Sequence, residues 1–328
     1  MGTGRDEAVR VGMTPDGTMT LVRSYHREVL RRLEPLLGDG PAPTCLHPGL
    51  VWAATRPAAG DAAGPAAGDG RPEDPADGPA PDPARTAELV RELSTAGLMP
   101  PLRHLTPDGT AADPDWCRWG TGQLQADIRR TGGTGDADFG TLDPTEGIAT
   151  LEAARQTLRR VWPEAALETD LLIRVIVYVR GGAFRSATLR PTFGAVYLGT
   201  SSVESPAAAF EALLHETGHH ALYLRNFFET YVTNGDVLVS HPLRPDPRPV
   251  SGAVHAAHVL ARMAHGLARW SAEPDAPPEA AARRDDALRR LRGTVEALEP
   301  AAEWTDRGRA WFDDLLRWEK ELTAAHPL

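Results

Sequence analysis

Several features are scarce in this chain of 328 residues. Its two cysteines, Cys45 and Cys117, are too few for a disulfide framework or for a metal site built from thiolates. No apolar run approaches the roughly 18 residues that predict a membrane-spanning helix, and the first residues lack the apolar segment of a secretory signal. The sequence therefore predicts a soluble, cytoplasmic protein without a membrane partner.

Positive charge is also in short supply. The chain has 35 lysines and arginines against 45 acidic residues, which gives a formal net charge of −10. Its single lysine is Lys320. A surface that binds nucleic acid needs a basic stripe to neutralise phosphates. We therefore expect no nucleic-acid partner.

Side chains able to anchor a core are missing from one long segment, Pro57–Arg85, in which 21 of 29 residues are Ala, Gly or Pro. Such a composition cannot bury enough apolar surface to offset the entropy of ordering. We predict a disordered insertion over residues 53–85. It would separate an N-terminal helical segment (1–52), packed on the main domain, from a metal-dependent catalytic domain (86–328).

The rest of the chain shows mostly helical periodicity. The predicted helices are Met19–Leu37, Thr86–Leu98, Pro144–Trp162, Pro206–Phe228, Gly252–Trp270, Pro277–Leu298 and Trp304–Leu322. The β-branched segment Leu171–Arg180 predicts a strand, and Phe193–Leu198 predicts a second strand with the character of a sheet edge. Because strands precede a block of helices, the predicted class is α+β, dominated by helix.

Most of the eleven histidines fall late in the chain, and the decisive motif is His215-Glu216-Thr217-Gly218-His219. Residues at positions i and i+4 share one face of a helix, so His215 and His219 can present two imidazoles to one ion with Glu216 beside them. Chance histidines on a solvated helix face are the alternative. His220 lies off the ligand face, as a surface residue or a support for the ligands.

A protein metal site of this kind needs a third ligand. The metzincin pattern is excluded, because Leu222 and Arg225 stand where it requires Gly and His. Glu229 and Asp236 are carboxylate candidates. His255 and His258 are stronger ones, because His255, His258 and Arg262 share one face of the helix that follows; packed, non-ligating histidines are the alternative there.

The order of these segments resembles that in the HExxH-motif family of peptide-modification proteins. Members of this family are found beside the clusters for ribosomally made peptides. The resemblance covers roughly Glu146 to the C-terminus. It is carried by the strand motif Gly194–Leu198, the motif Leu213–His219, the loop Asp246–Gly252 and the helix Ala253–Arg262.

The resemblance implies an iron(II)- and 2-oxoglutarate-dependent hydroxylase that uses dioxygen to modify a side-chain β-carbon of a precursor peptide. It implies a zincin-like active-site helix with a short sheet edge beside it, and not a cupin barrel. His215, His219 and His255 would be the metal ligands, with His258 in reserve. Arg248 and Arg262 match the family's arginines, and either would hold the far carboxylate of 2-oxoglutarate.

Zinc gives a second interpretation, a metallopeptidase. In it, Glu216 takes a proton from a metal-bound water, and Phe193–Leu198, as an edge strand, aligns the peptide. Under the iron interpretation Glu216 instead orients a ligand or water. The usual iron site of such oxygenases has two histidines and a carboxylate as ligands. A set of three histidines differs from it. A non-enzymatic scaffold is a third class, but it would require a decayed motif, and the motif is intact.

Overall fold

The computed structural model describes residues 15–37, 42–55, 81–97, 99–130, 144–179, 184–227, 230–240 and 247–326. In these residues the fold is α+β and dominated by helix, as predicted. The helices are α2 (Pro15–Leu37), α3 (Pro48–Thr55), α4 (Pro83–Leu93), α5 (Asp115–Arg130), α6 (Pro144–Val161), α7 (Pro163–Leu172), α8 (Pro206–Asn226), α9 (Val250–Ser271), α10 (Pro278–Ala301) and α11 (Asp306–Ala325). None of them is both long and apolar enough to cross a membrane.

A small four-stranded sheet lies in the core, and its two middle strands are fully buried. Its strands β1 (Arg103–Leu105), β2 (Val175–Val179), β4 (Ala195–Gly199) and β3 (Ser186–Ala187) follow one another in that order. The first three are parallel, and β3 pairs with β4 in the antiparallel direction. Parallel strands covered on both faces are expected to be continuously apolar, and every residue of β2 and β4 is buried. A separate two-stranded ribbon pairs β5 (Leu238–Val239) with β6 (Arg248–Pro249).

Two predictions about the strands need correction. The first predicted strand begins four residues late, at Val175, because Leu171 and Leu172 end the unpredicted helix α7. That helix begins directly after Trp162 with a proline in its first turn, a position that proline favours. The second strand, predicted as a sheet edge, lies between β2 and β3 and is therefore internal; β3 forms that edge.

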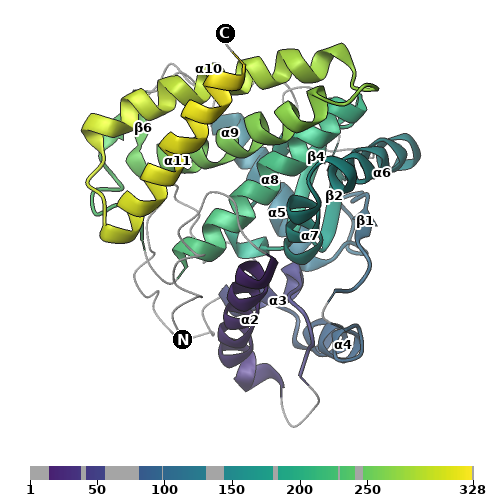
Figure 1. The fold of residues 1–328 in the computed structure, drawn as a ribbon. Helices are drawn as coiled ribbons and strands as arrows, with labels where there is room; N and C mark the ends of the chain where they lie inside the picture. The colour runs from purple at the N-terminus through teal and green to yellow at the C-terminus, as the bar shows by residue number, and fades with distance from the viewer. Residues whose placement is uncertain are drawn as a thin grey trace.

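The C-terminal helices form one end of the molecule and the N-terminal helices the other, with α8 between them (Figure 1). One side of α8 packs into the large core cluster, which includes Leu214, Ala257 and Leu298. Its other side, at Ala221 and Leu224, joins the cluster built by α2, α3 and α4. The motif-bearing helix is thus held from both sides, which fixes the positions of its histidines.

The N-terminal helical segment packs on the main body, because Val22, Tyr25 and Val29 of α2 lie in the same cluster as Leu224 of α8. Most of the predicted insertion, residues 56–80, lies outside the described residues. Its two ends are ordered, since α3 continues to Thr55 and α4 begins at Pro83. The predicted start of the catalytic domain at residue 86 therefore falls inside α4.

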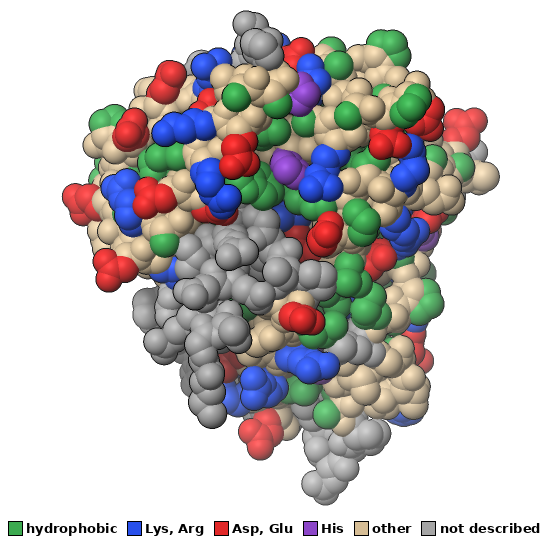
Figure 2. Space-filling view, viewed as in Figure 1, with side chains coloured by type: hydrophobic (Ala, Val, Ile, Leu, Met, Phe, Trp, Pro, Cys, Tyr) green, Lys and Arg blue, Asp and Glu red, His purple; other side chains and the backbone are tan. Residues whose placement is uncertain are grey.

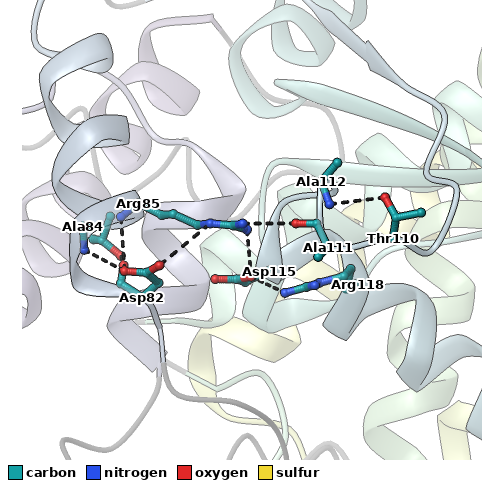
Figure 3. A network of polar contacts seen from close by, with 9 residues as sticks. Asp82, Ala84, Arg85, Thr110, Ala111, Ala112, Asp115 and Arg118 are labelled. Atoms are coloured by element: carbon teal, nitrogen blue, oxygen red, sulfur yellow. Dashed lines mark hydrogen bonds and ion pairs between the residues drawn. The ribbon is translucent and has the colours of Figure 1, made fainter.

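A polar network fastens α4 to α5 directly after the insertion (Figure 3). Asp82 caps α4 by accepting the amide of Ala84 at 2.8 Å, and Arg85 donates to Asp115 at 3.2 Å and to the carbonyl of Ala111 at 3.1 Å.

On the face drawn in Figure 2, acidic and basic side chains are interspersed rather than segregated. This face shows no basic stripe.

Candidate metal centre

Helix α8 presents the histidine motif because its start is well defined. Ser205, in extended conformation, accepts the amide of Ala208 at 3.2 Å, and Pro206 occupies the first turn. Both features stabilise a helix N-terminus. From that start the helix runs unbroken to Asn226, so His215 and His219 lie one turn apart on one face, as the spacing predicts.

The structure brings together the three predicted ligands. Nε2 of His219 lies 3.1 Å from Nε2 of His215, and Nδ1 of His219 lies 3.4 Å from Nδ1 of His255 on α9. Nitrogens bound about 2.0–2.1 Å from one tetrahedral ion are separated by about 3.4 Å. The two separations are therefore similar to those of neighbouring ligands on a metal ion.

The three rings do not yet point one nitrogen each at a common centre. His219 turns its Nε2 to His215 and its Nδ1 to His255, and no three or more His, Cys, Asp or Glu side chains of the described residues are arranged as they stand to hold an ion. The two nitrogens of an imidazole are separated by a single ring carbon, and rotation about χ2 has broad minima. Imidazole nitrogens at these separations are the donor type that suits a divalent metal, while the rings as they stand do not converge on one centre.

Glu216 is buried beneath these histidines, with 1 % of its surface exposed. Its Oε2 accepts a hydrogen bond from the Thr188 hydroxyl at 2.5 Å. Its Oε1 has no hydrogen-bond partner among the described residues and lies 3.9 Å from Nε2 of His215. One carboxylate oxygen is therefore anchored, while the other is aimed at the histidine cluster, where it could orient a ligand or accept a proton.

His220 is a supporting residue and is buried rather than on the surface. Its Nε2 accepts the amide of Gly194 at 2.9 Å, and its Nδ1 lies 3.0 Å from the carbonyl of Glu216. Burial lowers its pKa to about 4, so the ring is neutral at pH 7. The ring thereby ties α8 to the turn before β4, where Gly194 has a φ of +99°, a conformation that favours glycine.

The other histidine of α9, His258, lies behind the cluster. It is completely buried, and neither ring nitrogen has a hydrogen-bond partner among the described residues. Burial, followed by the charges of Arg225 and Arg262, holds its pKa well below the ordinary value. Its ring faces Trp311, with the centroids 6.1 Å apart, whereas His255 contacts His219 directly.

The two predicted cosubstrate arginines occupy different environments. Arg262 is 1 % exposed and forms a buried ion pair with Glu168 of α7. Arg248 is partly buried in β6, where its backbone pairs with Val239, two residues before α9 begins. Arg262, which matches an arginine of the family motif, is therefore already paired with a carboxylate of the protein itself.

The predicted carboxylate alternatives do not join the cluster in what the structure describes. Asp236 is exposed in the turn that leads to β5. Glu229 lies outside the described residues, as does His241, a histidine to which no role is assigned.

Four nearby residues were missed by the sequence analysis. The Sδ of Met263 lies 3.4 Å from Nδ1 of His215, and the Tyr223 ring stands 4.8 Å from that of His255. Tyr223 follows His219 by four residues, so helical spacing alone could have found it. Thr188 and Met263 reach the site through tertiary packing, which leaves no local signal. The fourth, Arg225, was used only to exclude the metzincin pattern.

No known protein-family model matches this chain, and no curated protein sequence is significantly similar to it.

Proposed function

We propose that the protein is an iron(II)- and 2-oxoglutarate-dependent hydroxylase acting on a side-chain β-carbon of a ribosomally synthesised peptide. His215, His219 and His255 would hold the iron, which with 2-oxoglutarate and dioxygen supplies the oxidising chemistry. The observation that carries the proposal is the meeting of three imidazoles from two helices in front of buried arginines. An anionic cosubstrate gives those guanidinium groups a chemical role, which peptide hydrolysis does not.

The surrounding residues would position rather than react. Thr188 holds one oxygen of Glu216, so the other oxygen can accept a hydrogen bond from a ligand of the metal. His215 is 36 % exposed, which gives a substrate access from one side of the cluster. The active-site helix beside a short antiparallel edge strand is what we take to be a zincin-like arrangement, and not a cupin barrel.

The edge strand β3 is the element that would align an extended peptide. It lies at the end of the sheet, and Thr188, which donates a hydrogen bond to Glu216, follows it directly. A peptide that adds to a sheet edge gains main-chain hydrogen bonds while its side chains alternate in direction. Every second side chain of the peptide would then face α8.

A zinc metallopeptidase is the second candidate, favoured by the position of Glu216. Its unpartnered Oε1 beside His215 suits a group that takes a proton from a metal-bound water. Three histidines are also a recognised ligand set for catalytic zinc. The same residues would hold the metal in either case.

One experiment separates the two. Protein purified without oxygen is given iron(II), 2-oxoglutarate and a candidate precursor peptide, then exposed to air, and the peptide is weighed by mass spectrometry. Gain of one oxygen atom, with conversion of 2-oxoglutarate to succinate, supports the hydroxylase. Cleavage of a peptide bond without 2-oxoglutarate overturns it in favour of the peptidase. His215→Ala serves as the control and abolishes either reaction.

A further inference from the structure

Behind the three histidines, Arg225 lies in a group of guanidinium groups that, among the described residues acting on it, outnumber the carboxylates. Arg225 of α8 is completely buried, and the charged groups acting on it are Glu168, Arg262 and Arg307. Three guanidinium groups thus face one carboxylate. That carboxylate is already engaged, because Glu168 forms the ion pair with Arg262.

The hydrogen-bonding needs of Arg225 are also unmet. None of its three guanidinium nitrogens meets hydrogen-bond geometry with a described residue, although the Tyr231 hydroxyl lies beside it. A guanidinium has five N–H donors, and one neutral hydroxyl cannot satisfy them. Burying a charge without a partner costs several kcal/mol or more, so a closed site of this kind calls for an anion.

Helix packing places this charge next to the candidate metal centre. Helices α8 and α9 run antiparallel, since His219 meets His255 while His215, earlier on α8, meets Met263, later on α9. Arg225 follows Gly218 by two turns, and Gly218 faces Val259 and Arg262. Arg225 is therefore on the side of α8 that faces α9, and it is one of the charged groups that act on His258, together with Arg262, His255 and His219.

We propose that Arg225, with His258 and Arg262 beside it, forms a buried site for a small carboxylate directly behind the histidine cluster. The fork of Arg225 matches a carboxylate in a bidentate pair, and neutral His258 supplies one further N–H donor. A surface pocket lined by Trp162, Glu168, Arg262 and Trp318 reaches the Arg262–Glu168 pair from solvent and offers a route of entry.

The identity of the carboxylate rests on the proposed function, whereas the existence of the site does not. If the protein is the proposed hydroxylase, Arg225 holds the far carboxylate of 2-oxoglutarate, while Arg262 remains paired with Glu168. Glutarate is the matched probe, since it has the same two carboxylates and lacks the keto oxygen needed for chelation. It reports the carboxylate site in metal-free protein.

The test uses the full chain, stripped of metal, in a chloride-free buffer. Glutarate is expected to raise the melting temperature of the wild type and to bind in calorimetry, with at least a tenfold weaker Kd in Arg225→Met. Without glutarate, Arg225→Met should melt at or above the wild-type temperature, because it removes an uncompensated buried charge. Arg289→Met, at an exposed arginine of α10 that does not line this pocket, should bind glutarate like the wild type.

Three results overturn the proposal: no glutarate binding to metal-free wild type, equal binding by Arg225→Met, or saturation by chloride alone with no further effect of glutarate. If Arg225→Met melts well below the wild type, Arg225→Lys, which keeps the charge but loses the fork, is measured instead. Wild-type affinity in that variant overturns the bidentate site. Hydroxylation is scored separately on the peptide, so glutarate binding without peptide oxidation rejects the proposed function and keeps the carboxylate site.

Discussion

Gly218 of α8 lies directly against Val259 of α9. A Cβ atom at Gly218 would stand 2.9 Å from Cγ1 of Val259 and 3.4 Å from its Cα, closer than a side chain tolerates. The glycine at the centre of the histidine motif is therefore what allows the two ligand-bearing helices to approach, and what brings His255 to His219.

We predict that Gly218→Ala pushes α9 away from α8. Overpacking of this kind costs about 1–3 kcal/mol, and the shift would also weaken metal binding because His255 moves with its helix. Gly252→Ala is the control, since it lies on α9 with open space around its Cβ position. Chemical denaturation and metal affinity should both be nearly unchanged in the control, and an unchanged Gly218→Ala would contradict this packing.

The metal ligands can be separated by substitution on α9. His255→Ala should reduce bound zinc or iron from near one ion per chain to near zero, because it removes the imidazole that contacts His219. His258→Ala should retain most of the metal, since its ring lies behind the cluster, facing Trp311. Elemental analysis after dialysis measures both; the reverse result would transfer the third-ligand role to His258.

Thr188 should act through Glu216. Thr188→Val keeps the shape but removes the hydroxyl that holds Oε2. Losses of this kind cost about 10- to 100-fold in activity or metal affinity, and we expect the loss in kcat, with KM and metal content little changed. Thr188→Ser restores the hydroxyl and should restore the rate, whereas a rate as low as that of Thr188→Val would exclude this role.

The buried pair of Glu168 and Arg262 should be sensitive to loss of one partner. Glu168→Gln leaves Arg262 charged and without its carboxylate at 1 % exposure, which costs about 3–5 kcal/mol. The double variant Glu168→Gln with Arg262→Met should recover much of that loss, because it removes the charge as well. Urea unfolding of both variants and the wild type measures the coupling, and additive effects would contradict it.

Stability should fall in mild acid because of His47. Burial, and then the charges of Arg103 and Arg174, lowers the pKa of His47 from 6.5 to about 3, and its Nδ1 accepts the amide of Gly49 at the start of α3. The unfolded chain binds this proton below pH 6.5 and the folded chain does not, so the stabilisation present above pH 6.5 is lost as the pH falls toward 3. The slope is at most about 1.4 kcal/mol per pH unit for this group.

His47→Asn tests that assignment, since asparagine also accepts an amide hydrogen bond at a helix start. Its free energy of unfolding should depend less steeply on pH between 6 and 4 than that of the wild type. Some slope should remain, because the pKa values of buried His220 and His265 are also lowered, to about 4. An identical slope in His47→Asn would show that other groups carry the effect.

The sequence by itself determined most of the described helices, though not α3, α5 or α7, and the face on which the motif histidines lie. Periodicity, Ser205 as a cap and Pro206 in the first turn are local properties, so α8 began where predicted. The same spacing placed His215 and His219 together, and it put His255 on the following helix. Helix α7 was missed because its sequence has no amphipathic pattern: Leu167 is exposed, whereas Glu168 and Thr169 are buried. Its last residues, Leu171 and Leu172, were therefore predicted as the start of a strand.

Only the tertiary structure decided which residues meet across elements. It chose His255 over His258 as the neighbour of His219, because close packing at Gly218 sets the rotation and height of α9 against α8. It also engaged Arg262 with Glu168 and left Arg225 as a buried charge in need of an anion. Pairings between α7, α8 and α9 depend on how the helices pack, and no local pattern in the sequence records that.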